Sequence, residues 1–408
     1  MVRRGISRHE TTEWARTLLV AVAAAALAHA PPARGAKAGV QDDRLGGVPL
    51  EELSARLDLI GASGARVARV DVFWTDVAPA RPTRAEDPSD PAYRWERLDH
   101  IVAGLRARRI APLLAAYDTP AWAAGGRSAP PSSPGYNPWM PAPSVYGRFM
   151  GALARRYSGA YTAPGGRRPL PRVRLFEIWN EPNLQLYFRP QYVRQRVASI
   201  GNYARLVRAA YPRIKRANPG AVVIAGASGP KTFSRGNGIG AMQWLVGLVR
   251  SEAPFDAYSQ HISPAAAPRV QSPFVPSWSS IPDLLRALDA RRPGIPLYVT
   301  EASYTTSPTP FRRVVFTDAQ QAAYLRQIFA LPAVRGPRVP VVIWFNLQDN
   351  PSWPGGLLRE DGTPKPSLAV FRQVARTAVR RRPAAGRTQA PGGGRGRPGS
   401  PRAAGRWR

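Results

Sequence analysis

Cysteine is absent from the 408 residues of this chain. Its absence excludes thiol nucleophiles, disulfides and thiolate metal sites. It says little about compartment, because a domain of this size can be stable through its core alone. Histidine is scarce, and its four occurrences are scattered without forming a ligand cluster. We therefore expect no metal and no other cofactor.

Acidic residues are few, at 26 against 58 basic ones, and the formal net charge is +32. A charge of this size is typical of nucleic-acid binding. However, only four of the basic residues are lysine, and the arginines accompany abundant alanine, proline and glycine, as in GC-rich coding. We interpret the charge as a solvated basic surface and expect no nucleic-acid partner. A weak attraction to acidic polysaccharide or to an anionic cell surface remains open.

Long apolar runs are also missing, and the one candidate, residues 18–28, is shorter than the roughly 20 residues that span a bilayer. It follows Arg3, Arg4, Arg8 and Arg16 and ends near Ala28-His29-Ala30, which resembles a cleavage site. Residues 1–30 therefore predict a signal peptide and a secreted, extracellular protein, either free or associated with the cell surface. After cleavage we expect no stable membrane insertion; an uncleaved anchor is the alternative.

The other end of the chain, residues 380–408, consists mostly of Arg, Gly, Pro, Ala and Ser without periodicity. Such a composition cannot bury a core, so we expect a disordered basic tail. Residues 31–379 remain for a single folded domain.

Within this domain, short apolar segments alternate with amphipathic helical patterns. The eight strand candidates are residues 38–41, 66–73, 110–116, 173–179, 221–225, 255–261, 295–300 and 339–345. Nearly continuous apolar strands separated by helices predict an α/β fold with a parallel sheet. Eight such units fit a (β/α)8 TIM barrel. A doubly wound open sheet is the alternative, but no Gly-rich phosphate loop follows an early strand.

Two glutamates stand just past strand candidates on opposite sides of the predicted barrel. Glu181 follows the fourth strand, and Pro182 should keep it out of the next helix; Glu301 ends the seventh strand. In a TIM barrel the carboxyl ends of the strands form the active site. A pair of carboxylates there suits glycosidic bond cleavage, in which one protonates the leaving oxygen and the other attacks or stabilises the sugar. Each glutamate alone has a second interpretation, as a helix N-cap.

The segment Phe176-Glu177-Ile178-Trp179-Asn180-Glu181-Pro182-Asn183 resembles the acid/base motif of the clan A retaining glycoside hydrolases. The most similar family is glycoside hydrolase family 39, which comprises β-xylosidases, α-L-iduronidases and exopolysaccharide endoglycosidases. The resemblance continues through Val299-Thr300-Glu301, Trp344 and Gly356-Leu357. It implies that Glu181 is the general acid/base, that Glu301 is the nucleophile, and that Asn180 bonds the sugar 2-hydroxyl. The family's xylosidases carry an additional β-sandwich for assembly, and no room remains for it here, so we expect a monomer.

Two further residues, Arg69 and His261, are predicted to bind substrate or to support the pair. Arg69 lies in an apolar strand and needs a partner, which is Glu301 or, alternatively, Glu177 or Asp71. His261 ends the sixth strand, where the clan has a histidine; a buried structural histidine is the alternative. The clan's tyrosine two residues later is Ser263 here, and Tyr258 or Tyr304 is a possible substitute.

Aromatic and acidic residues near other strand ends complete the candidates. Trp344 resembles the clan's sugar platform, and Trp122 lies in a long aromatic-rich loop. Asp118 follows the third strand and either binds a sugar hydroxyl or caps a helix. Asp42 and Asp43, which follow the first strand, are equally ambiguous.

These residues predict a secreted retaining O-glycosidase that acts on a poly- or oligosaccharide. A non-catalytic carbohydrate-binding barrel at the cell surface is the alternative, although binding alone does not require the glutamate pair.

Overall fold

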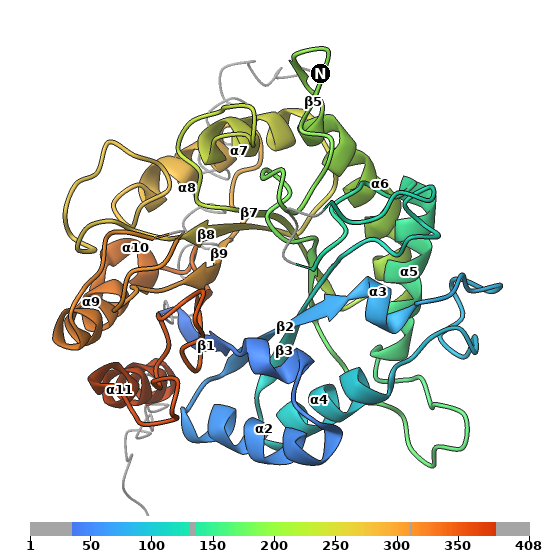
Figure 1. Cartoon of the computed structure of the whole chain (residues 1–408), viewed down its shortest axis with the longest axis horizontal. Helices are drawn as coiled ribbons and strands as arrows, with labels where there is room; N and C mark the ends of the chain where they lie inside the picture. The colour runs from blue at the N-terminus through green and yellow to red at the C-terminus, as the bar shows by residue number, and fades with distance from the viewer. Residues whose placement is uncertain (1–34, 131–134, 311, 381–408) are drawn as a thin grey trace, which may run out of the picture.

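The computed structural model describes residues 35–130, 135–310 and 312–380, so the predicted signal peptide and basic tail lie outside the described residues. Eight parallel strands close into a barrel, and helices surround it (Figure 1). The strands are β1 (Lys37–Gln41), β2 (Val67–Phe73), β3 (Ala111–Tyr117), β4 (Leu175–Ile178), β7 (Val222–Ser228), β8 (Ala257–Ile262), β9 (Leu297–Ala302) and β10 (Val341–Trp344). They are neighbours in chain order, and β10 pairs with β1. The predicted (β/α)8 barrel is confirmed.

The helices follow the predicted rhythm and cover the outside of the barrel (Figure 1). The main ones are α2 (Leu53–Ala62), α4 (Glu96–Ala107), α5 (Pro143–Arg156), α6 (Ser199–Ala217), α7 (Ala241–Arg250), α8 (Ile281–Asp289), α9 (Asp318–Ala330) and α11 (Pro366–Arg380). Short elements are η1 (Asp43–Gly46), η2 (Leu50–Glu52), α3 (Trp74–Val77), α10 (Pro332–Arg335) and the hairpin of β5 (Tyr192–Val193) and β6 (Arg196–Val197). Among the described residues, no helix is long and apolar enough to cross a membrane.

The side chains of each strand contribute alternately to two apolar cores, because successive side chains of a strand point to opposite faces of the sheet. The small inner core fills the barrel with Val67, Leu113, Ile224, Ala257, Tyr298, Val341 and Ile343. The larger core lies between strands and helices and includes Val342 and Trp344. This alternation fixes which residues at the carboxyl ends of the strands face the barrel mouth.

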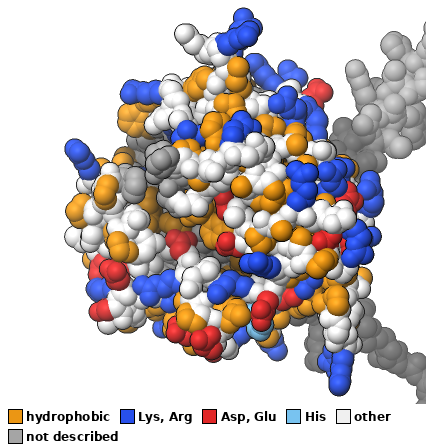
Figure 2. All heavy atoms as spheres, turned by 45° about the vertical axis from the view of Figure 1, so that its right-hand side comes forward, with side chains coloured by type: hydrophobic (Ala, Val, Ile, Leu, Met, Phe, Trp, Pro, Cys, Tyr) orange, Lys and Arg blue, Asp and Glu red, His pale blue; other side chains and the backbone are white. Residues whose placement is uncertain are grey.

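Many of the basic residues in the described part of the chain are exposed. On the face drawn in Figure 2, Lys and Arg side chains are spread widely and Asp and Glu side chains lie among them. This distribution fits the interpretation of a solvated basic surface.

Candidate active site

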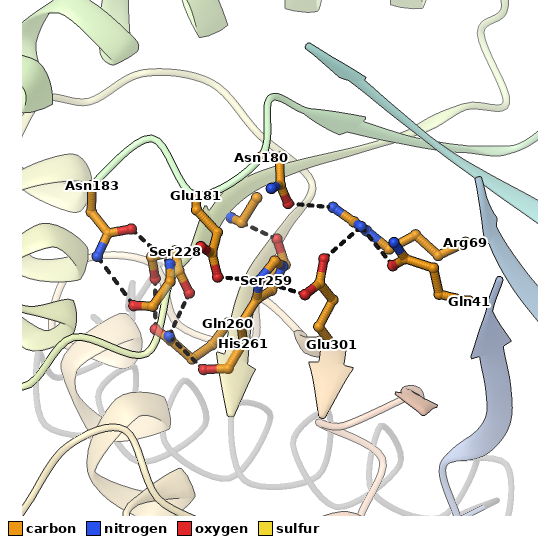
Figure 3. A network of polar contacts seen from close by, with 12 residues as sticks. Gln41, Arg69, Asn180, Glu181, Asn183, Ser228, Ser259, Gln260, His261 and Glu301 are labelled. Atoms are coloured by element: carbon orange, nitrogen blue, oxygen red, sulfur yellow. Dashed lines mark hydrogen bonds and ion pairs between the residues drawn. The ribbon is translucent and has the colours of Figure 1, made fainter. Parts of the chain in front are cut away.

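Glu181 and Glu301 meet at the carboxyl end of the barrel, and His261 lies between them (Figure 3). His261 Nδ1 is 2.9 Å from Glu181 Oε1 and 3.4 Å from Glu301 Oε2. One carboxylate oxygen of each glutamate and a ring nitrogen of His261 all lie within 4.8 Å of one another. His261 and Glu301 lie in β8 and β9, Glu181 follows the end of β4, and up to 120 positions of the sequence separate the three residues. The closed barrel is therefore what brings the pair together.

The backbone around Glu181 is held in an unusual conformation. Trp179 and Glu181 have φ values of 71° and 41°, in a region that residues other than glycine rarely adopt. The Glu181 N–H donates to the Ala227 carbonyl at the end of β7 (2.8 Å), and the Trp179 side chain is fully buried. Such strain persists only where the surroundings fix it, and it is common at functional sites. As predicted from Pro182, Glu181 stays outside the following helix.

Glu301 reaches the barrel mouth through a β-bulge. Tyr298 faces the barrel interior, so strict alternation would direct Thr300 inward and Glu301 outward. However, Gln260 pairs with Val299 and the next residue, His261, pairs with Glu301, which leaves Thr300 as an extra residue. A bulge redirects the following side chain, and the Glu301 carboxylate consequently faces Arg69 and His261.

Arg69 is the centre of the charged network (Figure 3). Its fully buried guanidinium donates to Glu301 Oε1 (2.7 Å) and to Glu177 Oε2 (2.7 Å), and it also contacts Asp71 Oδ1 (3.0 Å). The partners that the sequence offered as alternatives are thus all engaged at once. Because one cation serves three carboxylates, removal of Arg69 would leave several buried charges uncompensated.

The ionisation of Glu301 is not determined by Arg69 alone. The guanidinium by itself would lower the pKa of this carboxyl group. Instead, burial raises the pKa of Glu301 to about 7, since it outweighs the lowering by His261 and Arg69, while the nearby Glu181 and Asp71 raise it further. For His261, burial acts to lower the pKa, but Glu301 and Glu181 outweigh it, so the pKa is raised. Glu301 is therefore largely ionised only near and above neutral pH.

Asn180 is oriented by the same arginine. Its amide oxygen accepts from Arg69 Nη2 (2.8 Å), and the side chain is almost fully buried beside Glu181. With the oxygen committed to Arg69, the amide nitrogen is the group that Asn180 offers as a donor. This orientation suits the hydrogen bond to a sugar hydroxyl that the family resemblance implies.

A second network, of hydrogen bonds near the ends of β4, β7 and β8, supports Glu181 and His261 (Figure 3). The sequence did not indicate this network. Asn183 accepts from the Gly229 N–H (2.6 Å) and donates to the Gly229 and Ile239 carbonyls. Ser228 donates to Gln260 Oε1 (2.6 Å), whose amide donates to the carbonyls of Ser228 and His261. These bonds tie together the ends of β4, β7 and β8.

Gly229 belongs to this network for a steric reason. A Cβ atom at this position would lie 2.9 Å from Glu181 Cδ and 2.7 Å from Leu184 Cδ1. Both distances are shorter than side chains tolerate, so the Glu181 carboxylate occupies space that only glycine leaves open. Neither the motif nor the residue spacing revealed this contact.

Trp344 is not placed as a sugar platform. It is 1% exposed, it packs in the core between strands and helices, and its Nε1 donates to the Gly355 carbonyl (2.9 Å). The physical reason is the alternation of β10, in which Ile343 faces inward and Trp344 faces outward. The next residue, Phe345, is partly exposed and contacts Trp353 (ring centroids 5.7 Å apart).

Trp122 and Asp118 serve to pack and order their loop. Trp122 contacts Trp74 edge to face, and its Nε1 donates to the Ala78 carbonyl (2.8 Å). Asp118 is buried and accepts from the Asn137 N–H (2.7 Å), and burial raises its pKa to about 6. It stabilises the long loop after β3, and since a turn at residues 121–126 rather than a helix follows it, the alternative of a helix cap is wrong.

The two tyrosines suggested as substitutes at Ser263 have other partners. The Tyr258 hydroxyl meets Ser228 Oγ (2.9 Å), and the Tyr304 hydroxyl donates to the Ala266 carbonyl (3.0 Å). Of the first-strand acids, Asp42 forms an ion pair with Arg56. Asp43 accepts from Gln41 Nε2 (3.2 Å) near the barrel mouth.

A cavity of about 390 Å³ opens beside the pair on the β1 and β2 side. Its lining includes Gln41, Asp43, Asp71, Phe73 and Tyr136. Since Asp71 and Gln41 both contact Arg69, this cavity adjoins the nucleophile candidate. The carboxylate oxygens of Glu181 and Glu301 and a ring nitrogen of His261 are also close enough together to hold a metal ion. They already bond one another and Arg69, which competes with metal binding.

Solved structures share this barrel. It is similar to a family 39 glycoside hydrolase from Bacteroides cellulosilyticus WH2, with a TM-score of 0.57 and 23% identity over 84% of this chain and 64% of the other. It is also similar to a monomeric β-xylosidase from Caulobacter crescentus CB15 (TM-score 0.58, 20% identity, 84% and 68% covered). A third is a family 5, subfamily 18 glycoside hydrolase from Streptomyces cattleya in complex with GlcNAc (TM-score 0.60, 18% identity, 86% and 82% covered).

These similarities show that the chain shares the (β/α)8 barrel fold of these glycoside hydrolases. The resemblance inferred from the sequence is thus confirmed at the level of the fold. The chain spans 64% of the length of the first of these structures. No protein-family model and no curated protein sequence matches the chain.

Proposed function

We propose that this protein is a retaining O-glycosidase that cleaves a poly- or oligosaccharide. The observation that supports this best is the glutamate pair at the barrel mouth, with an oxygen of each within 4.8 Å of the other. Retaining enzymes hold their carboxyl groups about 5–5.5 Å apart, whereas inverting enzymes leave about 6.5–9.5 Å for a water molecule. The short separation favours direct attack by one carboxylate.

In the first step, Glu301 attacks the anomeric carbon and forms a glycosyl ester, while the bond to the leaving oxygen breaks and Glu181 gives that oxygen its proton. In the second step, Glu181 takes a proton from water, the water oxygen attacks the anomeric carbon, and the ester bond to Glu301 breaks. Both inversions together retain the configuration. Arg69 stabilises ionised Glu301, and His261 holds the two carboxylates in place.

The sequence supports an extracellular location for this activity through the export signal at residues 1–30. We propose that the mature chain begins near Pro31, works as a monomer and binds carbohydrate outside the cell. The titles of the similar structures name a xylosidase and a GlcNAc complex. They support a carbohydrate substrate without fixing its identity.

The test is to incubate the chain from Pro31 with a panel of aryl β-glycosides and plant and bacterial polysaccharides, beside Glu301→Ala and Glu181→Ala. We expect hydrolysis by the wild type alone. With azide present, Glu181→Ala should form a β-glycosyl azide from a substrate with a good leaving group, which identifies it as the acid/base. Tight binding of a glycan without hydrolysis over days would support the carbohydrate-binding alternative and refute the proposal.

A further inference from the structure

Two phenylalanine rings are displayed at the carboxyl end of the barrel. Phe233 is 58% exposed and Phe274 is 53% exposed, and their rings meet edge to face with centroids 6.0 Å apart. They belong to two different loops, residues 229–240 after β7 and residues 263–280 after β8. Single exposed apolar side chains need no explanation. In contrast, a pair of exposed rings from two different loops on the active-site face requires an explanation.

The position of the pair relative to Glu181 follows from the chain. Gly229 contacts the Glu181 carboxylate, and Phe233 comes only four residues later. Because an extended chain spans at most about 3.6 Å per residue, the two Cα atoms lie within about 14 Å. The loop is tied to the segment after Glu181, since Leu184 and Gly238 form a bridge.

The two sides of the catalytic pair are chemically different. The cavity with Asp43 and Asp71 adjoins Arg69, which bonds the nucleophile. Ser228, which directly precedes the loop that begins at Gly229, lies on the other side of Glu181 from Arg69 (Figure 3), and a Cβ atom at Gly229 would lie 2.9 Å from Glu181 Cδ. Since Glu181 protonates the leaving oxygen in the proposed reaction, the leaving part of the substrate must lie on its own side. That is the side of Phe233 and Phe274.

Hydrogen bonds hold the loops that carry the rings. The Gly240 N–H donates to Ser234 Oγ (2.9 Å), and the Phe274 N–H donates to Ser272 Oγ (3.1 Å). Polar residues adjoin each ring in the sequence, with Ser234 and Arg235 after Phe233 and Ser272 before Phe274. A narrow aromatic surface flanked by hydrogen-bonding groups matches a sugar ring, which has apolar C–H faces and a polar edge. A lipid would require a wider apolar surface.

We propose that Phe233 and Phe274 bind a sugar unit on the leaving-group side of the cleaved bond. This inference rests on the proposed function. It assigns to the two phenylalanine rings the role of binding a substrate that continues beyond the cleaved bond.

The experiment compares wild type with the double variant Phe233→Ala/Phe274→Ala. Leu59→Ala is the control, because Leu59 is 44% exposed on the outer helix α2. Substrates are aryl β-glycosides and the reduced β-1,4-linked gluco-, manno- and xylo-oligosaccharides of two to six units. We expect the double variant to keep kcat/KM on the aryl glycoside within twofold and to lose about tenfold or more on the hexasaccharide. Leu59→Ala should match wild type on both.

An equal loss on both substrates, or no loss on the hexasaccharide, would overturn the proposal. A loss confined to an octyl glycoside would assign the rings to an apolar aglycone instead. If no substrate is cleaved, the proposed function itself fails. Calorimetric binding of the hexasaccharides to Glu301→Ala then still tests the rings, because the double substitution must weaken it.

Discussion

Gly229→Ala should impair Glu181 while it leaves the fold intact. The added Cβ would lie 2.9 Å from Glu181 Cδ, 3.0 Å from Glu181 Oε1 and 2.7 Å from Leu184 Cδ1. Carbon atoms prefer separations of about 3.5–4.0 Å, so the carboxylate must retreat by roughly 0.6–1 Å. Its 2.9 Å contact with His261 would then be lost or weakened. Because both clashing groups are side-chain ends that can move, we expect a stability cost of only about 1 kcal/mol.

The catalytic effect should be larger and selective. General acid catalysis contributes about 10²–10⁴-fold, and a misplacement of about 1 Å can cost 10²-fold. We therefore expect kcat to fall about 10²-fold on glycosides with poor leaving groups. A 2,4-dinitrophenyl glycoside needs no proton on departure, so formation of its glycosyl ester should change little.

The assay is a series of aryl glycosides whose phenols differ in pKa, with kcat/KM plotted against that pKa. Gly236→Ala is the matched control, because it lies in the same loop and its Cβ would meet nothing within 4 Å. Gly229→Ala should steepen the dependence, and Gly236→Ala should reproduce the wild type. An unchanged slope for Gly229→Ala would refute the steric reasoning, and an equal loss on every glycoside would mean that the substitution disturbs more than proton donation.

Three further substitutions test the charged network and the loop after β3. Arg69→Met should lower the free energy of unfolding by about 3–5 kcal/mol, because it leaves several buried carboxylates unpaired. In thermal unfolding, the double variant Arg69→Met/Glu177→Gln should recover part of this loss. An unchanged Tm for Arg69→Met would contradict the prediction. The raised pKa of Glu301, about 7, means that the folded protein binds more protons than the unfolded chain between about pH 4.5 and 7, so stability falls as pH rises through that window. Glu301→Gln should therefore be more stable than wild type at pH 8 and close to it at pH 4.5, and denaturant unfolding that gives the same difference at both would refute the assignment. Asp118→Ala should destabilise the protein by about 1–3 kcal/mol, because the Asn137 N–H loses its acceptor; aryl glycoside hydrolysis should stay within twofold, and a large rise in KM would restore Asp118 as a sugar ligand.

The sequence predicted the fold well because its signals were local and repeated. Each strand is a short apolar segment, and each helix that follows has an apolar face, so the order of the eight units could be derived without any long-range information. Glu181 was predictable for the same reason. It follows a strand directly, and Pro182 restricts its backbone.

The features that the sequence did not reveal depend on side-chain direction or on contacts across the barrel. Trp344 faces the helices because Ile343 faces the barrel interior. The sequence predicts the strand, but it does not reveal which of these two neighbouring residues points inward. Glu301 faces inward only because of a β-bulge at Thr300, and no glycine or proline at this position marks the bulge in the sequence. Gly229 matters because of Glu181, 48 positions earlier, and only the closed barrel brings the two together.

Burial raises the pKa of Glu301 to about 7, and the position of Arg69 explains why this arginine does not offset the effect of burial. A guanidinium that served Glu301 alone would hold its pKa low. Here the same cation also bonds Glu177, which is fully buried, and contacts Asp71, so its charge is divided among three carboxylates. Glu177 thus competes with Glu301 for Arg69. Glu177→Gln should therefore lower the pKa of Glu301 and move the acidic limb of the kcat/KM profile to lower pH. An unmoved limb would mean that burial alone sets the ionisation of Glu301.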